Sequence, residues 1–312
     1  MQTSSVLHPD CQRFLDYLEG IRQYSPHTVA SYGADLISLS CLFADTAPAQ
    51  VSALQIRKLT SQLHSKQLQP SSIARHLSCW RSFYHWYATE TGITTNPVVG
   101  IKAPKRSKPL PKALSVDEAV HLVGHALGDD ATQLANHAMF ELLYSSGLRV
   151  SELVTLDIAY RKHGSYYSAG WIDLDEQMVH VTGKGNKSRA VPVGSAAVTA
   201  LTSWLKIRDS LVKTELDALF LTSRGTRMSA RLVQLRIKAH AKSLSIQTDV
   251  HPHVLRHSFA SHVLQSSGDL RAVQELLGHS SLASTQVYTA LDFQHLAQTY
   301  DAAHPRAKTK KT

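Results

Sequence analysis

Four polar residues near the end of the chain carry the side chains that attack on a phosphodiester requires. They are His253, Arg256, His279 and Tyr288. On a helix, His253 and Arg256 share a face because they are three residues apart. A phenol can attack phosphorus, a guanidinium fork matches phosphate oxygens, and imidazoles exchange protons. The spacing therefore predicts a pocket in which a guanidinium, two imidazoles and a phenol converge on a phosphodiester.

Three short helices must position these side chains. Pro252 suits the first turn of one helix, where its fixed φ costs nothing. Gly268 followed by Asp269 is typical of a helix end and a new N-cap. Gly278 then ends the second helix, so the histidine after it lies on a turn, and a third helix carries the tyrosine.

This stretch resembles the active-site core of the tyrosine site-specific recombinases, whose pattern is H-x-x-R, then L-G-H, then a nucleophilic Tyr. Upstream, residues 147–153 (GLRVSEL) match the first-arginine motif of that family, and residues 183–189 (GKGNKSR) match its β-hairpin lysine. The tail, residues 291–308, looks like that of the bacterial chromosome-dimer resolvases within the family. The resemblance covers almost the whole chain.

The resemblance implies a covalent mechanism without metal or cofactor. Tyr288 would be the nucleophile and would form a 3′-phosphotyrosyl link. Its reference pKa of about 10 means that it needs cationic neighbours and a base. Arg149 and Arg256 would neutralise the non-bridging phosphate oxygens. Glu152, three residues after Arg149, is expected to pair with that arginine behind the site. Because the covalent link retains the phosphodiester energy, ATP is not needed.

Three further residues would complete the catalytic set of six. Lys184, on a hairpin tip, can reach the leaving 5′ oxygen as general acid, although Lys187 and Arg189 are rival candidates. Lys187 and Arg189 are also candidate DNA contacts. The resemblance implies that His253 would accept the proton of the tyrosine and that His279 would donate a hydrogen bond to a phosphate oxygen.

A metal site is the alternative interpretation of the histidines. His253 lies close to His251 and His257 in the sequence. However, neither an H-E-x-x-H nor an H-x-x-E-H pattern nor a cysteine pair accompanies them, so we expect no bound metal.

The positive charge is concentrated in two short segments. The 312 residues include 33 Lys and Arg against 24 Asp and Glu, a net charge of +9. Residues 305–312 hold four cations, and residues 101–112 hold five and no acid: Lys102, Lys105, Arg106, Lys108 and Lys112. Solubility is one explanation. The sharper one is a clamp on duplex DNA, in which flexible cations neutralise phosphates.

The distribution of apolar residues and the cysteine content favour a cytoplasmic protein with no membrane association. The first residues lack a basic-then-apolar signal and no run approaches about 18 apolar residues, so we expect neither a leader nor a membrane span. Three cysteines fit neither a disulfide framework nor a zinc spacing, and they suggest buried thiols in a reducing cytosol: Cys11, Cys41 and Cys79.

Two domains are expected from the length, and the fold class is mainly α. Residues 1–100 predict a four-helix bundle of the SAM-like, core-binding type, with Ile21 and Leu54 on its apolar faces. Arg75 and Arg81 are candidate DNA contacts there. As an alternative, they form the wet face of an amphipathic helix.

The proline-rich stretch 101–112 predicts an extended linker, and residues 113–312 a catalytic domain with a tail helix. The capping pattern Ser115–Glu118 opens it. Helices are expected at about 131–146, 195–212 and 229–243. A small antiparallel sheet is expected between residues 171 and 193. Residues 160–168 look like an insertion without an assigned role. Together this is the DNA breaking-rejoining fold of the resembled family.

The resemblance implies an enzyme that resolves chromosome dimers through a Holliday junction. It would act on DNA in a heterotetramer with a sister recombinase. A septal DNA translocase would control the reaction. Two other interpretations stay open: a mobile-element integrase of the same family, and an architectural DNA-binding protein without catalysis.

Overall fold

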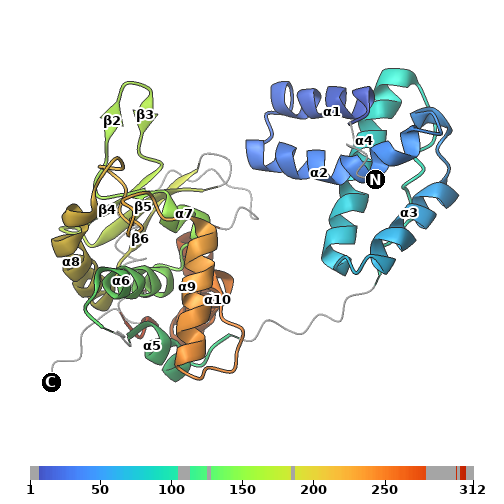
Figure 1. The fold of residues 1–312 in the computed structure, drawn as a ribbon. Helices are drawn as coiled ribbons and strands as arrows, with labels where there is room; N and C mark the ends of the chain where they lie inside the picture. Colours follow the sequence, from blue (N-terminus) through green and yellow to red (C-terminus); the bar gives the residue numbers. More distant parts are fainter. Residues whose placement is uncertain are drawn as a thin grey trace. The chain divides into compact units, whose positions relative to one another are not determined.

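The computed structural model describes residues 7–104, 113–124, 128–183, 187–278, 300 and 303–306. The chain divides into two compact units, Met1–Pro109 and Leu110–Thr312 (Figure 1). The division falls within the proline-rich stretch 101–112.

The first unit consists of helices whose starts are set by capping residues. The hydroxyl of Ser25 accepts from the backbone N–H of Thr28, and Ser52 forms a capping box with Gln55. The expected four-helix bundle is confirmed. Its elements are α1 (Pro9–Gly20), α2 (Pro26–Phe43), the 3₁₀ turn η1 (Pro48–Gln50), α3 (Ala53–Ser65) and α4 (Pro70–Thr91).

Aromatic residues of α4 form the centre of this bundle. Trp80 and Phe83 are fully buried, and the Trp80 indole donates to the carbonyl of Asp35 at 2.9 Å. Ile101 packs into the same core.

Three expectations about burial in this unit are wrong. Ile21 follows the last turn of α1 and is 74% exposed, and Leu54 in the first turn of α3 is 72% exposed. Helix ends project past the neighbouring helices, so periodicity alone cannot place them. Cys11 and Cys79 are buried, but Cys41 is exposed.

The second unit is mainly helical. Its helices are α5 (Val116–Gly124), α6 (Ala131–Ser145), α7 (Val150–Val154), α8 (Ser195–Arg208), the 3₁₀ turn η2 (Asp209–Leu211), α9 (Ala230–Ser243), α10 (Pro252–Ser267) and α11 (Leu270–Leu277). The expected capping box between Ser115 and Glu118 opens α5. Among the described residues, no helix has the length and apolar character needed to cross a membrane.

A four-stranded sheet with the order β1-β4-β5-β6 accompanies these helices. Strands β4 (Gly170–Asp173), β5 (Met178–Thr182) and β6 (Ser188–Pro192) are antiparallel, as expected. A short parallel strand, β1 (Leu156–Asp157), was not anticipated. The insertion at 160–168 forms a separate hairpin of β2 (Lys162–His163) and β3 (Tyr166–Tyr167), which stands out from the sheet in Figure 1.

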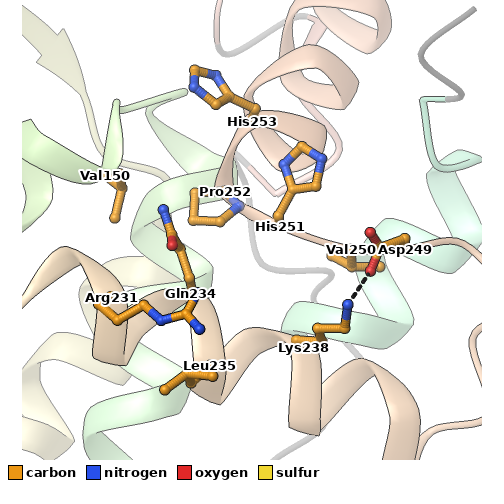
Figure 2. Close-up of a pocket in the computed structure, with 10 residues that line it drawn as sticks. All are labelled: Val150, Arg231, Gln234, Leu235, Lys238, Asp249, Val250, His251, Pro252 and His253. Atoms are coloured by element: carbon orange, nitrogen blue, oxygen red, sulfur yellow. Dashed lines mark ion pairs between the residues drawn. The ribbon is translucent and has the colours of Figure 1, made fainter. Parts of the chain in front are cut away.

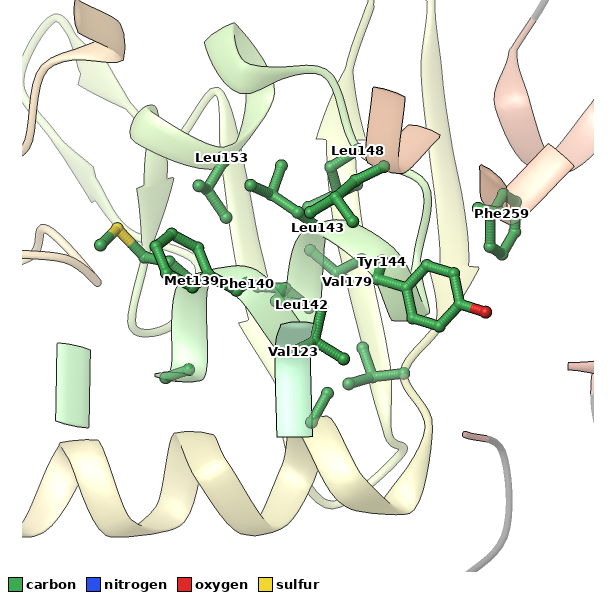
Figure 3. Packing of buried hydrophobic residues seen from close by; sticks show 14 of the residues in the cluster. Val123, Met139, Phe140, Leu142, Leu143, Tyr144, Leu148, Leu153, Val179 and Phe259 are labelled. Carbon is green, nitrogen blue, oxygen red and sulfur yellow. The ribbon is translucent and has the colours of Figure 1, made fainter. Parts of the chain in front are cut away.

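Helix α6 is the centre of the core, where it packs against α5, α8 and α10. Figure 3 shows Leu143 and Tyr144 of α6 with Leu153 of α7, Val179 of β5 and Phe259 of α10. Alternate strand residues supply the inner face of the sheet, because side chains on a strand alternate between its two faces. This core holds in place the C-terminal end of α6 and the N-terminal end of α7, where the site lies.

Residues near the C-terminus also pack on this unit. The Tyr300 hydroxyl bonds the Ser145 hydroxyl at 2.6 Å, and His304 is buried against Tyr144. Arg306, which was expected to be one of the free tail cations, pairs instead with the buried carboxylate of Glu141.

Candidate active site

Arg256 is the most deeply held cation of the site. It is 7% exposed on α10, and its two terminal nitrogens donate to the carbonyls of Gly147 and Leu277, each at 2.6 Å. Burial lowers the pKa of its guanidinium to about 10, with the charge of Arg149 acting in the same direction. The group is therefore cationic at neutral pH although it is desolvated.

Gly147 allows α6 to end close to this guanidinium. Its φ is +56°, and a Cβ there would lie 2.4 Å from the Phe259 ring. Only glycine fits both the backbone conformation and this packing. The chain then turns so that the Gly147 carbonyl faces Arg256 and Arg149 becomes the N-cap of α7.

Arg149 is oriented and still accessible, with its side chain 32% exposed. One terminal nitrogen donates to Glu152 at 2.8 Å, and the other lies 3.5 Å from the carbonyl of Gly278. The expected pairing with Glu152 is confirmed. Because a second residue holds the planar fork, its orientation is fixed before any ligand arrives.

Glu152 is a buried carboxylate shared by two arginines. It accepts from the backbone and side chain of Arg149 and from both terminal nitrogens of Arg189, at 2.8 to 2.9 Å. Burial acts to raise the pKa of this carboxyl, but the hydrogen bonds and charge of Arg189, and those of Arg149, hold it below its usual value. Glu152 is therefore ionised and offsets part of the positive charge.

All three arginines bind carbonyls at the end of α11. The Nε of Arg189 donates to Leu276 at 3.1 Å, Arg256 binds Leu277, and Arg149 approaches Gly278. The C-terminus of a helix carries partial negative charge, so cations are stabilised there. The arrangement fixes where the chain leaves α11 toward residues 279–288.

His253 lies one turn before Arg256 on α10 and is exposed. It borders a hollow of about 520 Å³, shown in Figure 2, together with Arg231, Gln234 and His251. Basic and apolar side chains both line this hollow. Among the described residues, no group of three or more His, Cys, Asp or Glu side chains is placed to hold a metal ion.

The residues of α9 in this hollow were not identified from the sequence. Arg231, Gln234, Leu235 and Lys238 are spaced as one helical face, which is the signal that was available. Lys238 is paired with Asp249 at 2.9 Å. Such a face is common on surface helices, so spacing alone did not mark it.

Three of the six expected catalytic residues lie outside the described residues: Lys184, His279 and Tyr288. The same holds for four expected DNA contacts of the linker: Lys105, Arg106, Lys108 and Lys112. The backbone N–H of Gly183 donates to the carbonyl of Lys187 at 2.8 Å, and Lys187 is exposed.

The other expected DNA contacts differ in their availability. Lys102 and Arg81 are exposed, and one nitrogen of Arg81 lies 3.4 Å from the Ile101 carbonyl. Arg75 is half exposed but pairs with the buried Asp35 at 2.8 Å.

Arg189 departs from the expected role of a DNA contact or rival general acid. Its side chain points inward and is largely buried, and its guanidinium is bound by Glu152 and the Leu276 carbonyl. We therefore assign it to the support of Arg149. The sequence could not distinguish an inward from an outward cation at the start of a strand.

Comparison with known proteins covers both units. Residues 112–295 match the Phage integrase family, and residues 11–91 match the phage integrase N-terminal SAM-like domain. Tyrosine recombinase XerC of Ralstonia pickettii (strain 12J) is 53% identical over 313 residues, which cover 97% of this chain and 95% of that protein. Tyrosine recombinase XerC of Alcanivorax borkumensis is 45% identical over 300 residues, with 96% and 94% covered.

A crystal structure of a lambda integrase (75–356) dimer bound to a COC′ core site shares the fold. Its TM-score is 0.65 at 18% identity, over 90% of this chain and 99% of that one.

Proposed function

The chain belongs to the phage integrase family of tyrosine recombinases, and we propose that it resolves chromosome dimers at a dif-type site with an XerD-like sister recombinase. It is a DNA strand-transferring enzyme that cuts and rejoins DNA at specific sites. The relatives named XerC, which match nearly end to end, support the narrower assignment.

The proposed reaction is a transesterification. The phenol oxygen of Tyr288 attacks phosphorus and forms a 3′-phosphotyrosyl bond, while the bond to the 5′ oxygen breaks. Lys184 gives its proton to that leaving oxygen, and His253 takes the proton of the phenol. His279 hydrogen-bonds a phosphate oxygen. The 5′ hydroxyl of the partner strand later reverses these steps and joins the strands through a Holliday junction.

The observation that carries this proposal is the arrangement of Arg149 and Arg256. Both donate to carbonyls at the end of α11, although the two arginines lie more than 100 residues apart in the sequence. Fixed cations in a partly desolvated site stabilise the charge that develops on a pentacoordinate phosphate better than mobile ones. The two guanidiniums supply the charge that a metal supplies in many nucleases, so the reaction should be independent of metal and ATP.

We propose that duplex DNA is held by cations from both units. The candidates are Arg75, Arg81, Lys102, Lys105, Arg106, Lys108 and Lys187. An FtsK-like septal translocase would control the reaction, which would take place in the cytoplasm in a heterotetramer of the two recombinases.

The experiment combines this protein, its sister recombinase and a dif-type duplex, with a duplex of scrambled sequence as the control. Holliday junctions should form only when both proteins and the intact site are present, and excess EDTA should not reduce them. Junction formation by this chain alone on the ends of a mobile element would instead favour the integrase alternative. DNA binding without any covalent adduct would favour the architectural one.

A further inference from the structure

The β2–β3 hairpin is a feature that the proposed reaction does not use. Residues 158–169 contain no Asp or Glu, and β2 consists of Lys162 and His163. Arg161 precedes this strand and pairs with Asp217 at 3.4 Å. Its tip stands away from the body of the unit in Figure 1. A short projecting hairpin with this composition is a candidate surface for a polyanion.

The hairpin is anchored rigidly at its base. Asp157 is fully buried and accepts from the Tyr166 hydroxyl and the Ser168 hydroxyl, each at 2.6 Å, and from Arg227 at 2.7 Å. The Ser168 hydroxyl also accepts from the backbone N–H of Arg161 at 2.9 Å. The hydroxyls of Tyr166 and Ser168 thus tie one side of the hairpin to the sheet, and the Arg161 N–H ties the other side to Ser168, so the base of the hairpin is fixed.

Strand pairing decides which side chains face away from this anchor. Lys162 pairs with Tyr167 and His163 pairs with Tyr166, so each pair shares one face of the hairpin. Tyr166 points inward to Asp157. Lys162 and Tyr167 therefore occupy the opposite face, where Lys162 is exposed and Tyr167 is 65% exposed. A cation and a hydroxyl donor lie side by side there.

The hairpin leaves the sheet at the same end as Gly183, the last described residue before the expected catalytic lysine. Its second strand runs into β4, whose first residue Gly170 pairs with Val181 near the end of β5. The backbone N–H of Thr182 donates to the Ala169 carbonyl at 3.0 Å. The next residue, Gly183, begins the turn that carries the expected catalytic lysine. The base of the hairpin and Gly183 therefore lie at the same end of neighbouring strands.

We propose that this hairpin is an additional contact to duplex DNA, in which Lys162 and Tyr167 bind backbone phosphates beside the cleavage site. The proposal rests on the proposed function, because it needs DNA at the neighbouring turn. Lysine and tyrosine are both donors to phosphate oxygens, and such contacts position a protein without reading sequence. The absence of acidic residues from the segment and its position beside the turn favour DNA over a protein partner.

The test compares Lys162→Gln and the double variant Lys162→Gln/Tyr167→Phe with the wild-type chain. Lys206→Gln, which changes an exposed lysine on α8, is the matched control. Binding to a half-site duplex is measured at several salt concentrations. Loss of the Lys162 contact should reduce the log–log salt slope by about 0.9 and weaken binding severalfold for any sequence, whereas Lys206→Gln should leave both unchanged. Ethylation interference should lose one cluster of phosphates in the double variant.

A second measurement, the amount of covalent adduct formed on a nicked duplex at saturating protein, distinguishes failure of this proposal from failure of the proposed function. Lys162→Gln should reach the wild-type level of adduct, because Lys162 is not in the catalytic set. A wild-type chain that neither binds nor cleaves DNA would refute the proposed function. If the wild-type chain cleaves DNA but Lys162→Gln leaves the log–log salt slope and the ethylation-interference pattern unchanged, the hairpin contact alone is refuted. A defect seen only when the sister recombinase is added would refute it too, in favour of a protein interface.

Discussion

Glu152 is the residue on which the order of the site depends. It lies between Arg149 and Arg189 and binds both. Without its charge, two guanidiniums would remain close to Arg256, which is itself desolvated. Removal of one partner from a buried ion pair commonly costs about 3 to 5 kcal/mol, since an uncompensated charge stays behind.

Glu152→Gln should therefore lower the free energy of unfolding by about 3 kcal/mol and slow cleavage at saturating DNA. Glu275→Gln is the control, because Glu275 pairs with the exposed Arg271 on one helix and should cost less than about 0.5 kcal/mol. Urea denaturation and single-turnover cleavage measure the two effects.

The pH dependence gives a second check on Glu152. Its folded pKa lies below the unfolded value, so its contribution is present above the usual carboxyl pKa of about 4.3 and is lost as the pH falls through the folded value. The stability difference between wild type and Glu152→Gln should shrink below about pH 4. A difference that stayed constant there would contradict the ionised carboxylate.

His304 makes the catalytic unit sensitive to mild acid. Burial lowers the pKa of its imidazole to about 3. Since the folded value lies below the unfolded one of about 6.5, stability is highest above pH 6.5 and declines by about 1.4 kcal/mol per pH unit below it. His304→Phe keeps a ring against Tyr300 and Phe259 and should flatten the decline between pH 7 and 5 in urea titrations. An equally steep decline in the variant would exclude His304 as its source.

At the scale of elements, the site depends on where α6 and α11 end. Gly147 and Gly278 both have positive φ, and the groups around them leave little room for a side chain. A Cβ on Gly278 would lie 3.0 Å from the Cδ of Arg189. The end of α11 and the position of Arg189 are therefore coupled.

Gly278→Ala and Gly268→Ala form a matched pair that tests this coupling. Both glycines end a helix in the left-handed conformation, with φ values of +63° and +68°. Apart from its two chain neighbours, nothing lies within 4 Å of the Cβ position at Gly268. Each alanine should cost about 1 kcal/mol from backbone conformation. Only Gly278→Ala should also slow cleavage, because it displaces Arg189. Equal cleavage rates for the two variants would show that α11 and Arg189 act independently.

Helix and strand positions followed from local signals in the sequence. Asp269 caps α11 and Gly268 ends α10, as expected, because caps satisfy groups within a few residues. The inward direction of Arg189 and its bond to Glu152 did not follow, since they join residues 37 apart. The anchoring of the hairpin at Asp157 likewise depends on Arg227, from a distant segment. Tertiary partners decided which cations are buried.

At the scale of the whole molecule, the two units each form a core, and basic residues cluster in the stretch that joins them. The C-terminal cations are partly used in the fold, because Arg306 binds Glu141. Truncation after Ala290 would remove Tyr300 and His304 from this core as well. A deletion that tests the expected tail helix, which lies outside the described residues, therefore has to retain residues 300–306.

Neutralising the linker cations should flatten the salt dependence of DNA binding. Each lost phosphate contact lowers the log–log slope by about 0.9, so five contacts would lower it by about 4.5. The variants carry glutamine in place of Lys102, Lys105, Arg106, Lys108 and Lys112. Fluorescence anisotropy on specific and scrambled duplexes should show the same loss for both. An unchanged slope would show that these cations only keep the linker solvated.

The central claim is that Tyr288 forms the covalent link to DNA. The most direct measurement traps the protein on a nicked duplex, digests the adduct and identifies the modified peptide by mass spectrometry. The expected result is a nucleotide on Tyr288, attached through its 3′ phosphate, with no adduct from Tyr288→Phe although that variant still binds DNA. A nucleotide on another residue, or normal adduct formation by Tyr288→Phe, would contradict the account.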